Sequence, residues 1–150
     1  MSINEDVELL RRIPMFAKVE PAKLKLLAFT SERVIYDGGQ ELFHQGDTSD
    51  AAYIIVDGTA DVVVDSPKGP LTVARLGKNE FVGDIGILCD VPRTATVRAA
   101  TQLITLKITK ELFFRMVTDF PAMGVEVMRV LAHRLELTTK QLQEARSRIA

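Results

Sequence analysis

The chain contains little cysteine and histidine: its 150 residues include one cysteine, Cys89, and two histidines, His44 and His133. One cysteine excludes an internal disulfide framework and a metal cluster held by several cysteines of the same chain. The two histidines lie far apart in the sequence, and we expect both to be structural. No run of about 18 apolar residues occurs, so no segment is long enough to span a membrane. The N-terminal residues MSINEDVELLRR are acidic before they are apolar, which is unlike a signal peptide, so we expect a cytoplasmic protein.

Neither sign of charge is in excess, because 19 Lys and Arg residues face 20 Asp and Glu residues, for a formal net charge of −1. A nucleic-acid-binding face spread over the whole domain would make the chain basic, so we expect no bound nucleic acid. The hydrophobic fraction of 47% and the charged fraction of 26% are ordinary for a globular protein. A chain of 150 residues fits one domain, 1–150.

The hydrophobic pattern divides this domain into three segments. Residues 1–30 predict a helical lead of short helices, which Pro14 and Pro21 delimit. Residues 31–108 are rich in Val, Ile and Thr and are interrupted by turns, which is typical of a barrel or sandwich. Residues 109–150 predict C-terminal helices. The predicted strands are 33–36, 41–44, 52–56, 60–64, 71–76, 94–98 and 103–108.

The long helix predicted from about Pro121 carries an apolar stripe with coiled-coil spacing of three and four residues. This stripe has two interpretations: it pairs with its twin in a parallel homodimer, or it folds back on its own barrel as a lid. A second stripe of Val127, Val130 and Leu137 remains to meet the barrel, which favours the dimer. The seam consists of Met128, Leu131, Leu135, Thr138, Leu142, Ala145 and Ile149.

The segment 81–97, FVGDIGILCDVPRTATV, breaks the strand pattern. Gly83 permits a sharp backbone turn, and residues 85–88 leave room for one helical turn before Pro92 ends it. Backbone N–H groups at the start of such a turn have no partner within the helix and bind anions.

Two side chains of this segment complete a nucleotide-sized site. Arg93 offers parallel N–H donors to phosphate oxygens, and Asp84 offers an acceptor to a sugar hydroxyl. Asp is also a favoured helix cap, so a purely structural role for Asp84 remains an alternative.

This segment resembles the phosphate-binding cassette of the cyclic nucleotide-binding domains, as found in catabolite activator protein and protein kinase A regulatory subunits. The family pattern is Phe-Gly-Glu-aliphatic-Ala/Ser-Leu, a short spacer, and Pro-Arg-x-Ala-x-Val. The resemblance implies a mainly β fold, an eight-stranded jelly roll with flanking helices, and cAMP or cGMP as the ligand. The matching residues, in unbroken spacing, are Gly83, Ile85, Ile87, Pro92, Arg93, Ala95 and Val97.

The resemblance also implies a role for individual residues. Arg93 and the backbone N–H groups of Gly86 and Ala95 would hold the cyclic phosphate. Gly83 and Asp84 would hold the ribose 2′-hydroxyl, and Ile85 belongs to the same binding segment. Thr94, next to the arginine, resembles the forms that favour guanine. The base would be covered from the long helix by Arg134, Thr138 or Thr139.

Two positions depart from the family pattern. Asp84 stands where the family has glutamate and is one methylene shorter, and Gly86 stands where the family has alanine or serine. Losing the ribose hydrogen bond costs on the order of 1–3 kcal/mol, which weakens binding without abolishing it. These departures keep open an alternative function, a ligand-free dimerisation domain of the same fold.

An enzyme of the cupin type would need clustered His and carboxylate ligands for a metal, and two distant histidines do not supply them. We therefore expect no enzyme, no metal and no cofactor, but a regulatory module that binds a cyclic nucleotide and signals through its last helix. We find no output domain in this sequence, so three interpretations stay open: a stand-alone receptor, a partner subunit that acts on a separate effector protein, or a domain of a larger protein.

Overall fold

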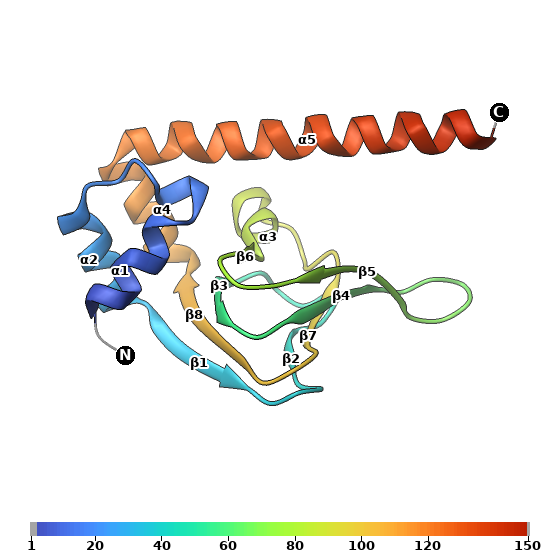
Figure 1. Cartoon of the computed structure of the whole chain (residues 1–150), viewed down its shortest axis with the longest axis horizontal. Helices are drawn as coiled ribbons and strands as arrows, with labels where there is room; N and C mark the ends of the chain where they lie inside the picture. The colour runs from blue at the N-terminus through green and yellow to red at the C-terminus, as the bar shows by residue number, and fades with distance from the viewer. Residues whose placement is uncertain (1–2, 150) are drawn as a thin grey trace.

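The computed structural model describes residues 3–149 and, of Ile85, the backbone alone; residues 1, 2 and 150 of the predicted segments lie outside the described residues. The described strands form two antiparallel four-stranded sheets, in the orders β1-β8-β3-β6 and β2-β7-β4-β5 (Figure 1). Their bounds are β1 (Glu32–Tyr36), β2 (Glu41–Phe43), β3 (Ala51–Asp57), β4 (Ala60–Val64), β5 (Leu71–Leu76), β6 (Phe81–Val82), β7 (Thr96–Ala99) and β8 (Leu103–Thr109).

Helices flank the sheets at both ends of the chain, and one short helix interrupts the strands. They are α1 (Ile3–Arg11), the 3₁₀ helix η1 (Pro14–Phe16), α2 (Pro21–Thr30), α3 (Asp84–Cys89), α4 (Lys110–Asp119) and α5 (Pro121–Ile149). The predicted mainly β, jelly-roll-like architecture with flanking helices is confirmed, whereas closure into an eight-stranded barrel stays a prediction.

Strand β7 begins two residues later than predicted, so Thr94 and Ala95 lie in a bend rather than in a strand. The reason is the length of the neighbouring strand. Strand β2 ends at Phe43, which pairs with Val97, so the residues before Thr96 have no strand partner on that side. This early end of pairing leaves the bend free to line a site.

The strand β3 explains how the layers stack, because six of its seven residues are buried. Ala52 and Ile54 belong to the core beneath the helices, and Tyr53 and Ile55 belong to the core between the sheets. Since successive side chains of a strand point to opposite faces, β3 is the middle of three layers: helices, first sheet, second sheet.

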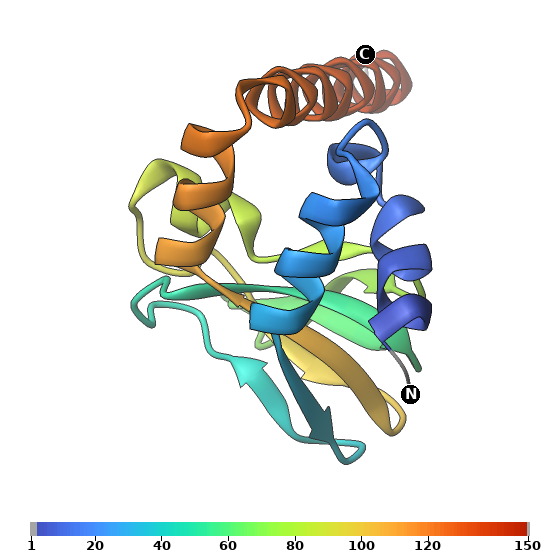
Figure 2. The same cartoon turned by 90° about the vertical axis from the view of Figure 1, so that its left-hand side faces the viewer.

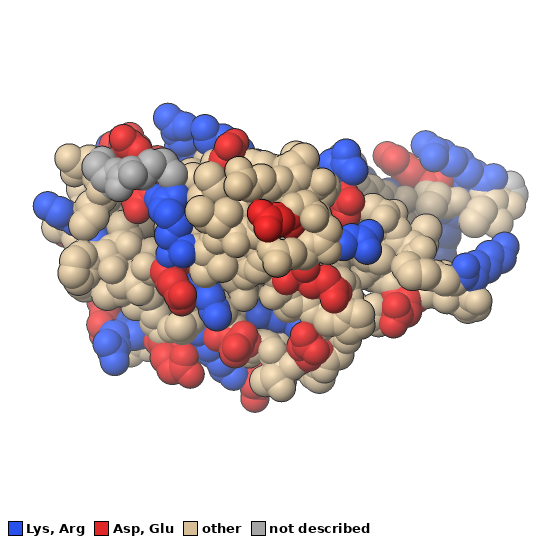
Figure 3. Space-filling model, turned by 90° about the horizontal axis from the view of Figure 1, so that it is seen from below, with Lys and Arg blue, Asp and Glu red and all other residues tan. Residues whose placement is uncertain are grey.

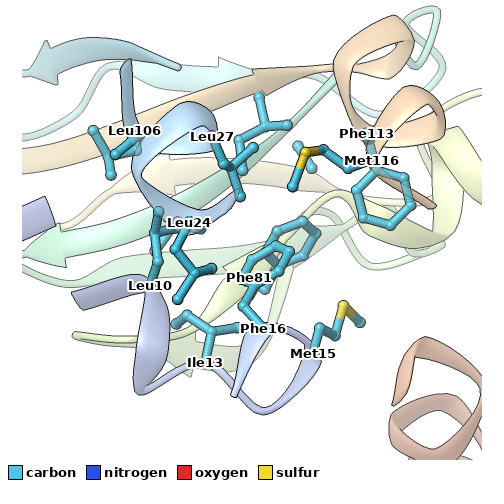
Figure 4. Packing of buried hydrophobic residues seen from close by; sticks show 14 of the residues in the cluster. Leu10, Ile13, Met15, Phe16, Leu24, Leu27, Phe81, Leu106, Phe113 and Met116 are labelled. Atoms are coloured by element: carbon cyan, nitrogen blue, oxygen red, sulfur yellow. The ribbon is translucent and has the colours of Figure 1, made fainter. Parts of the chain in front are cut away.

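Aromatic rings join the N-terminal helices, the start of the predicted cassette and α4. The ring centroids of Phe16 and Phe81 are 5.7 Å apart, and those of Phe81 and Phe113 are 6.0 Å apart. Figure 4 shows these rings among Leu24, Leu27 and Met116. Burying each phenylalanine contributes about 1.5–3 kcal/mol, so β6 is firmly held where the cassette begins.

Helix α5 has two different halves. Its N-terminal half packs on η1 and α4 (Figure 2). This half buries Met123 and Val127. Every residue from Leu135 to Ile149 is exposed, and Figure 1 shows this half extending past the sheets. Val130 packs against the helical core as expected, but Leu137 is 47% exposed, so the expected second stripe ends before the projecting half.

Most of the predicted seam on α5 lies open in this conformation, and only Leu131 among its described residues packs against the core beneath the helices. Met128, Leu135, Leu142 and Ile149 are 65%, 68%, 56% and 86% exposed. From Leu135 onward the seam is therefore not folded back on its own sheets as a lid. The dimer remains the other prediction.

Charges of both signs are mixed on the face that Figure 3 shows. Among residues 3–149, no helix is both long and apolar enough to cross a membrane.

Candidate functional site

A cavity of about 670 Å³ lies between the predicted cassette, the second sheet and α5. This volume falls within the range typical of small-molecule sites, about 300–1,000 Å³. Residues 83–97 contribute the floor of the cavity, and residues 129–134 of α5 contribute its roof. Val62 of β4 and Leu76 of β5 add an apolar wall.

Gly83 makes the turn that brings the floor together. Its φ of +88° is in the left-handed region, which favours glycine, and it caps the N-terminus of α3. A Cβ at this position would lie 2.6 Å from Nη1 of Arg93. Any other residue would therefore strain the backbone and displace Arg93.

Arg93 is buried, with 4% of its surface exposed. Nη1 donates a hydrogen bond of 3.0 Å to the Gly83 carbonyl, and Nη2 donates to the Ala51 carbonyl. The guanidinium carbon lies 3.9 Å from the centroid of the Phe43 ring, a cation–π contact that holds the group flat. These contacts fix the position of the guanidinium at the edge of the cavity.

The charge of Arg93 is poorly compensated. The carboxylate oxygen of Asp50 is 3.8 Å from Nη2, and Asp50 is itself exposed. Among the residues that the structure describes, Nε of Arg93 is buried and has no hydrogen-bond partner. Burial lowers the pKa of the guanidinium, which still carries its charge at neutral pH. A buried cation with an unused donor favours a bound anion.

Asp84 lies on the floor and is 3% exposed. Its Oδ2 accepts a hydrogen bond of 2.8 Å from Nη1 of Arg134, whose side chain is 40% exposed. This ion pair joins the first residue of α3 to α5 across 50 positions of sequence. Arg134, predicted as a residue that covers the base, is placed against the predicted ribose acceptor.

The structure brings most of the predicted site residues around one cavity. Thr138 and Thr139 are exposed on α5 and are not among the lining residues. The side chain of Ile85 lies outside the described part of the chain. The predicted residues that line the cavity are Gly83, Asp84, Gly86, Arg93, Thr94, Ala95 and Arg134.

Several lining residues were missed by sequence reasoning. His133, expected to be structural, lines the roof with Val130. Both lie within about two turns before Thr138, on the same stretch of α5 as the predicted Arg134, and which residue covers a base stays a prediction. Phe43 also lines the cavity, and its contact with Arg93 has no sequence signal because the two lie about 50 residues apart in the chain.

A cupin-type enzyme would need a cluster of His and carboxylate side chains to hold a metal ion. In the described ranges, no group of three His, Cys, Asp or Glu side chains is placed to hold a metal ion.

Comparison with known proteins gives the family. The profile of the cyclic nucleotide-binding domain matches residues 33–120. The N-terminal domain of a transcriptional regulator from Streptomyces coelicolor is 30% identical with a TM-score of 0.73, over 88% of this chain and 95% of that one. Catabolite activator protein from Thermus thermophilus is 25% identical with a TM-score of 0.79, over 87% and 62%.

A relative of a different kind is the lysophospholipase nte1 of Neosartorya fischeri, 28% identical over 130 residues. The match covers 86% of this chain and spans only 8% of that protein. Domain profile, fold and cavity agree, and the chain belongs to the cyclic nucleotide-binding domain family.

Proposed function

We propose that the chain is a regulatory sensor that binds cAMP or cGMP in the cavity above residues 83–97 and performs no chemistry on it. The observation that carries the proposal is Arg93, a buried guanidinium beside a ligand-sized cavity with Nε unpaired among the described residues. A cyclic phosphate is an anion with two exocyclic oxygens, which suits a planar group with parallel donors.

The phosphate end of the ligand would lie against Arg93 and the backbone N–H groups of Gly86 and Ala95. A guanidinium has more N–H donors than the carbonyls of Gly83 and Ala51 use, so these bonds need not break. These bonds fix the Arg93 side chain before the ligand arrives, which lowers the conformational entropy lost on binding.

The ribose would lie against Gly83 and Asp84. A carboxylate beside an anionic phosphate would repel it, but the Asp84 charge is balanced by Arg134 at 2.8 Å. In this ion pair the Asp84 carboxylate still offers an acceptor to the ribose hydroxyl, while the charge of Arg93 keeps the floor positive. Arg134 therefore serves the ribose end rather than the base.

The base would lie between Val62 and Leu76 of the sheet and the Val130–His133 stretch of α5, since all of them line the cavity. Thr94 lines the same cavity with an exposed side chain, so its hydroxyl is available to a guanine. The choice between cAMP and cGMP would rest on this residue.

The signal would leave through α5. A nucleotide that contacts floor and roof together would shift the equilibrium position of α5 by its difference in affinity for the two positions. The open seam of Met128, Leu135 and Leu142 supports a homodimer through α5, because exposed apolar stripes on a projecting helix mark contact surfaces. The match to a short part of a lysophospholipase supports action on a larger effector.

Isothermal titration calorimetry with cAMP and cGMP tests the proposal, with 5′-AMP as a control that lacks the cyclic phosphate. Saturable binding of either cyclic nucleotide and weaker binding of 5′-AMP is the expected result. No heat from either cyclic nucleotide at about 1 mM would overturn it. The ligand-free dimerisation domain would then be the better description.

A further inference from the structure

The loop between β2 and β3 has one buried side chain, near its C-terminal end. Ser49 is 6% exposed, while its neighbours Thr48 and Asp50 are exposed. The Ser49 hydroxyl donates a hydrogen bond of 2.6 Å to the carbonyl of Val91, which lies between α3 and Arg93. This loop therefore reaches under the floor of the cavity.

Ser49 occupies the space that a side chain at position 86 would need. A Cβ built on Gly86 would overlap Oγ of Ser49 and would lie 2.8 Å from its Cβ. Turning the hydroxyl away does not relieve the overlap, because Cβ of Ser49 does not move with it. Only a glycine at one of the two positions fits.

The contact bears on Arg93 as well as on packing. The same Cβ on Gly86 would lie 3.4 Å from Nη1 of Arg93. The loop also pairs with the Arg93 backbone, since Gly46 N–H donates to the Arg93 carbonyl and Arg93 N–H donates to the Asp47 carbonyl, each at 2.8 Å. The loop therefore holds the Arg93 backbone, and Ala51, the first residue of β3 directly after the loop, accepts from Nη2 of the side chain.

We propose that Ser49 is a positioning residue of the nucleotide site. Its side chain fills the space left by Gly86, and its hydroxyl fixes the segment between α3 and Arg93. It thereby sets the distance between the Gly86 N–H and the guanidinium, the two groups assigned to the phosphate. This inference rests on the proposed function and assigns a binding role to a residue outside the cassette.

A reciprocal exchange tests it: Gly86→Ala, Ser49→Gly and the double variant, with affinity measured by calorimetry and stability by urea unfolding. Gly86→Ala alone should weaken nucleotide binding about tenfold, because the overlap displaces Ser49 and with it the Val91 segment that leads to Arg93. Ser49→Gly alone should weaken it by a smaller factor. The double variant should return to within about threefold of the wild type, since the methyl group introduced at position 86 then fills the vacated space.

Two further variants separate the hydroxyl from the volume. Ser49→Ala keeps Cβ and removes the bond to Val91, and should also weaken binding. Ser66→Ala is the matched control, because Ser66 donates to the Gly69 carbonyl in the distant β4–β5 turn and should leave affinity unchanged. Single variants that bind as the wild type does, or losses that simply add in the double variant, overturn the proposal.

Amide hydrogen exchange of the free protein makes the test independent of the ligand. Faster exchange in α3 in Gly86→Ala, reversed in the double variant, supports the positioning role even if the wild type binds neither nucleotide. A wild type that binds neither nucleotide would contradict the proposed function but not the positioning role of Ser49. Unchanged exchange in both single variants contradicts the role of Ser49.

Discussion

The floor and the roof of the cavity are built differently. On the floor, Arg93 and Asp84 are 4% and 3% exposed, and every contact of Arg93 described above comes from the sheets or loops beneath it. On the roof, Arg134 keeps 40% of its side chain exposed, and the helix beyond it is exposed throughout. The two charged groups of the floor are buried, whereas the roof joins the packed first half of α5 to its exposed second half and meets the floor through the Asp84–Arg134 ion pair.

This difference assigns a separate task to each part. A rigid floor lowers the cost of ordering the groups that we propose bind the phosphate, and so would contribute mainly to affinity. The roof continues directly into the exposed half of α5, so a change in its position would be carried into that half, which suits transmission of a signal. Variants that change the floor or the roof alone test this difference.

The largest effect is expected from Arg93→Ala on the floor. Two charge-assisted hydrogen bonds to phosphate are worth about 3–6 kcal/mol together, so affinity should fall by at least about 100-fold. Calorimetry measures the change, and circular dichroism checks the fold. Arg98→Ala is the control, since Arg98 is exposed on the adjoining strand β7. Equal affinity of the Arg93→Ala protein and the wild type would remove Arg93 from the site.

Leu135→Asp should have the next largest effect and act on the roof helix alone. If α5 pairs with its twin, two leucine contacts are lost per dimer, about 3 kcal/mol, and the dimer should dissociate about 100-fold more readily. Sedimentation velocity reports the change. Leu137→Asp, which changes an exposed leucine off the seam, is expected to stay dimeric. A wild-type protein that is already monomeric would contradict the proposed homodimer.

Asp84→Asn breaks the contact between floor and roof. Asparagine keeps one acceptor oxygen and loses the charge that pairs with Arg134, so nucleotide affinity should fall about tenfold. Arg134→Gln should cause a smaller loss, and the double variant should lose less than the sum because one pair is removed by either change. Asp90→Asn, at the exposed C-terminal end of α3, is the control. Fully additive losses would show that the pair does not couple the two parts.

The smallest effect concerns the packed half of α5, where Glu126 accepts from Lys18 and Arg129. The hydrogen bond from Lys18 lowers the pKa of Glu126. A lowered carboxyl pKa stabilises the fold above the ordinary glutamate pKa, and this stability is lost as the pH falls through the lowered value. Unfolding in urea across this acidic range should show a slight loss in the wild type that Glu126→Gln lacks. Glu136→Gln, on the exposed half, should behave as the wild type does.

The cassette could be predicted from the sequence because its residues lie close together in the chain. Gly83, Asp84 and Arg93 fall within eleven positions, so local rules of turns, helix starts and phosphate recognition were enough to place them around one site. The strands were also predictable, because alternation and turn residues are local signals. The delayed start of β7 was not, since it depends on where its partner β2 ends.

The sequence by itself therefore determined the family, the mainly β architecture and the floor of the site. Only the tertiary structure decided that Arg134 meets Asp84, that His133 rather than Thr138 lines the roof, and that Ser49 fills the space beside Gly86. The Asp84–Arg134 and Ser49–Gly86 contacts join residues about 40 to 50 positions apart. Which residue of α5 lines the roof depends on where the straight helix extends past the folded core. Such distances are set by the packing of whole elements, which no local pattern encodes.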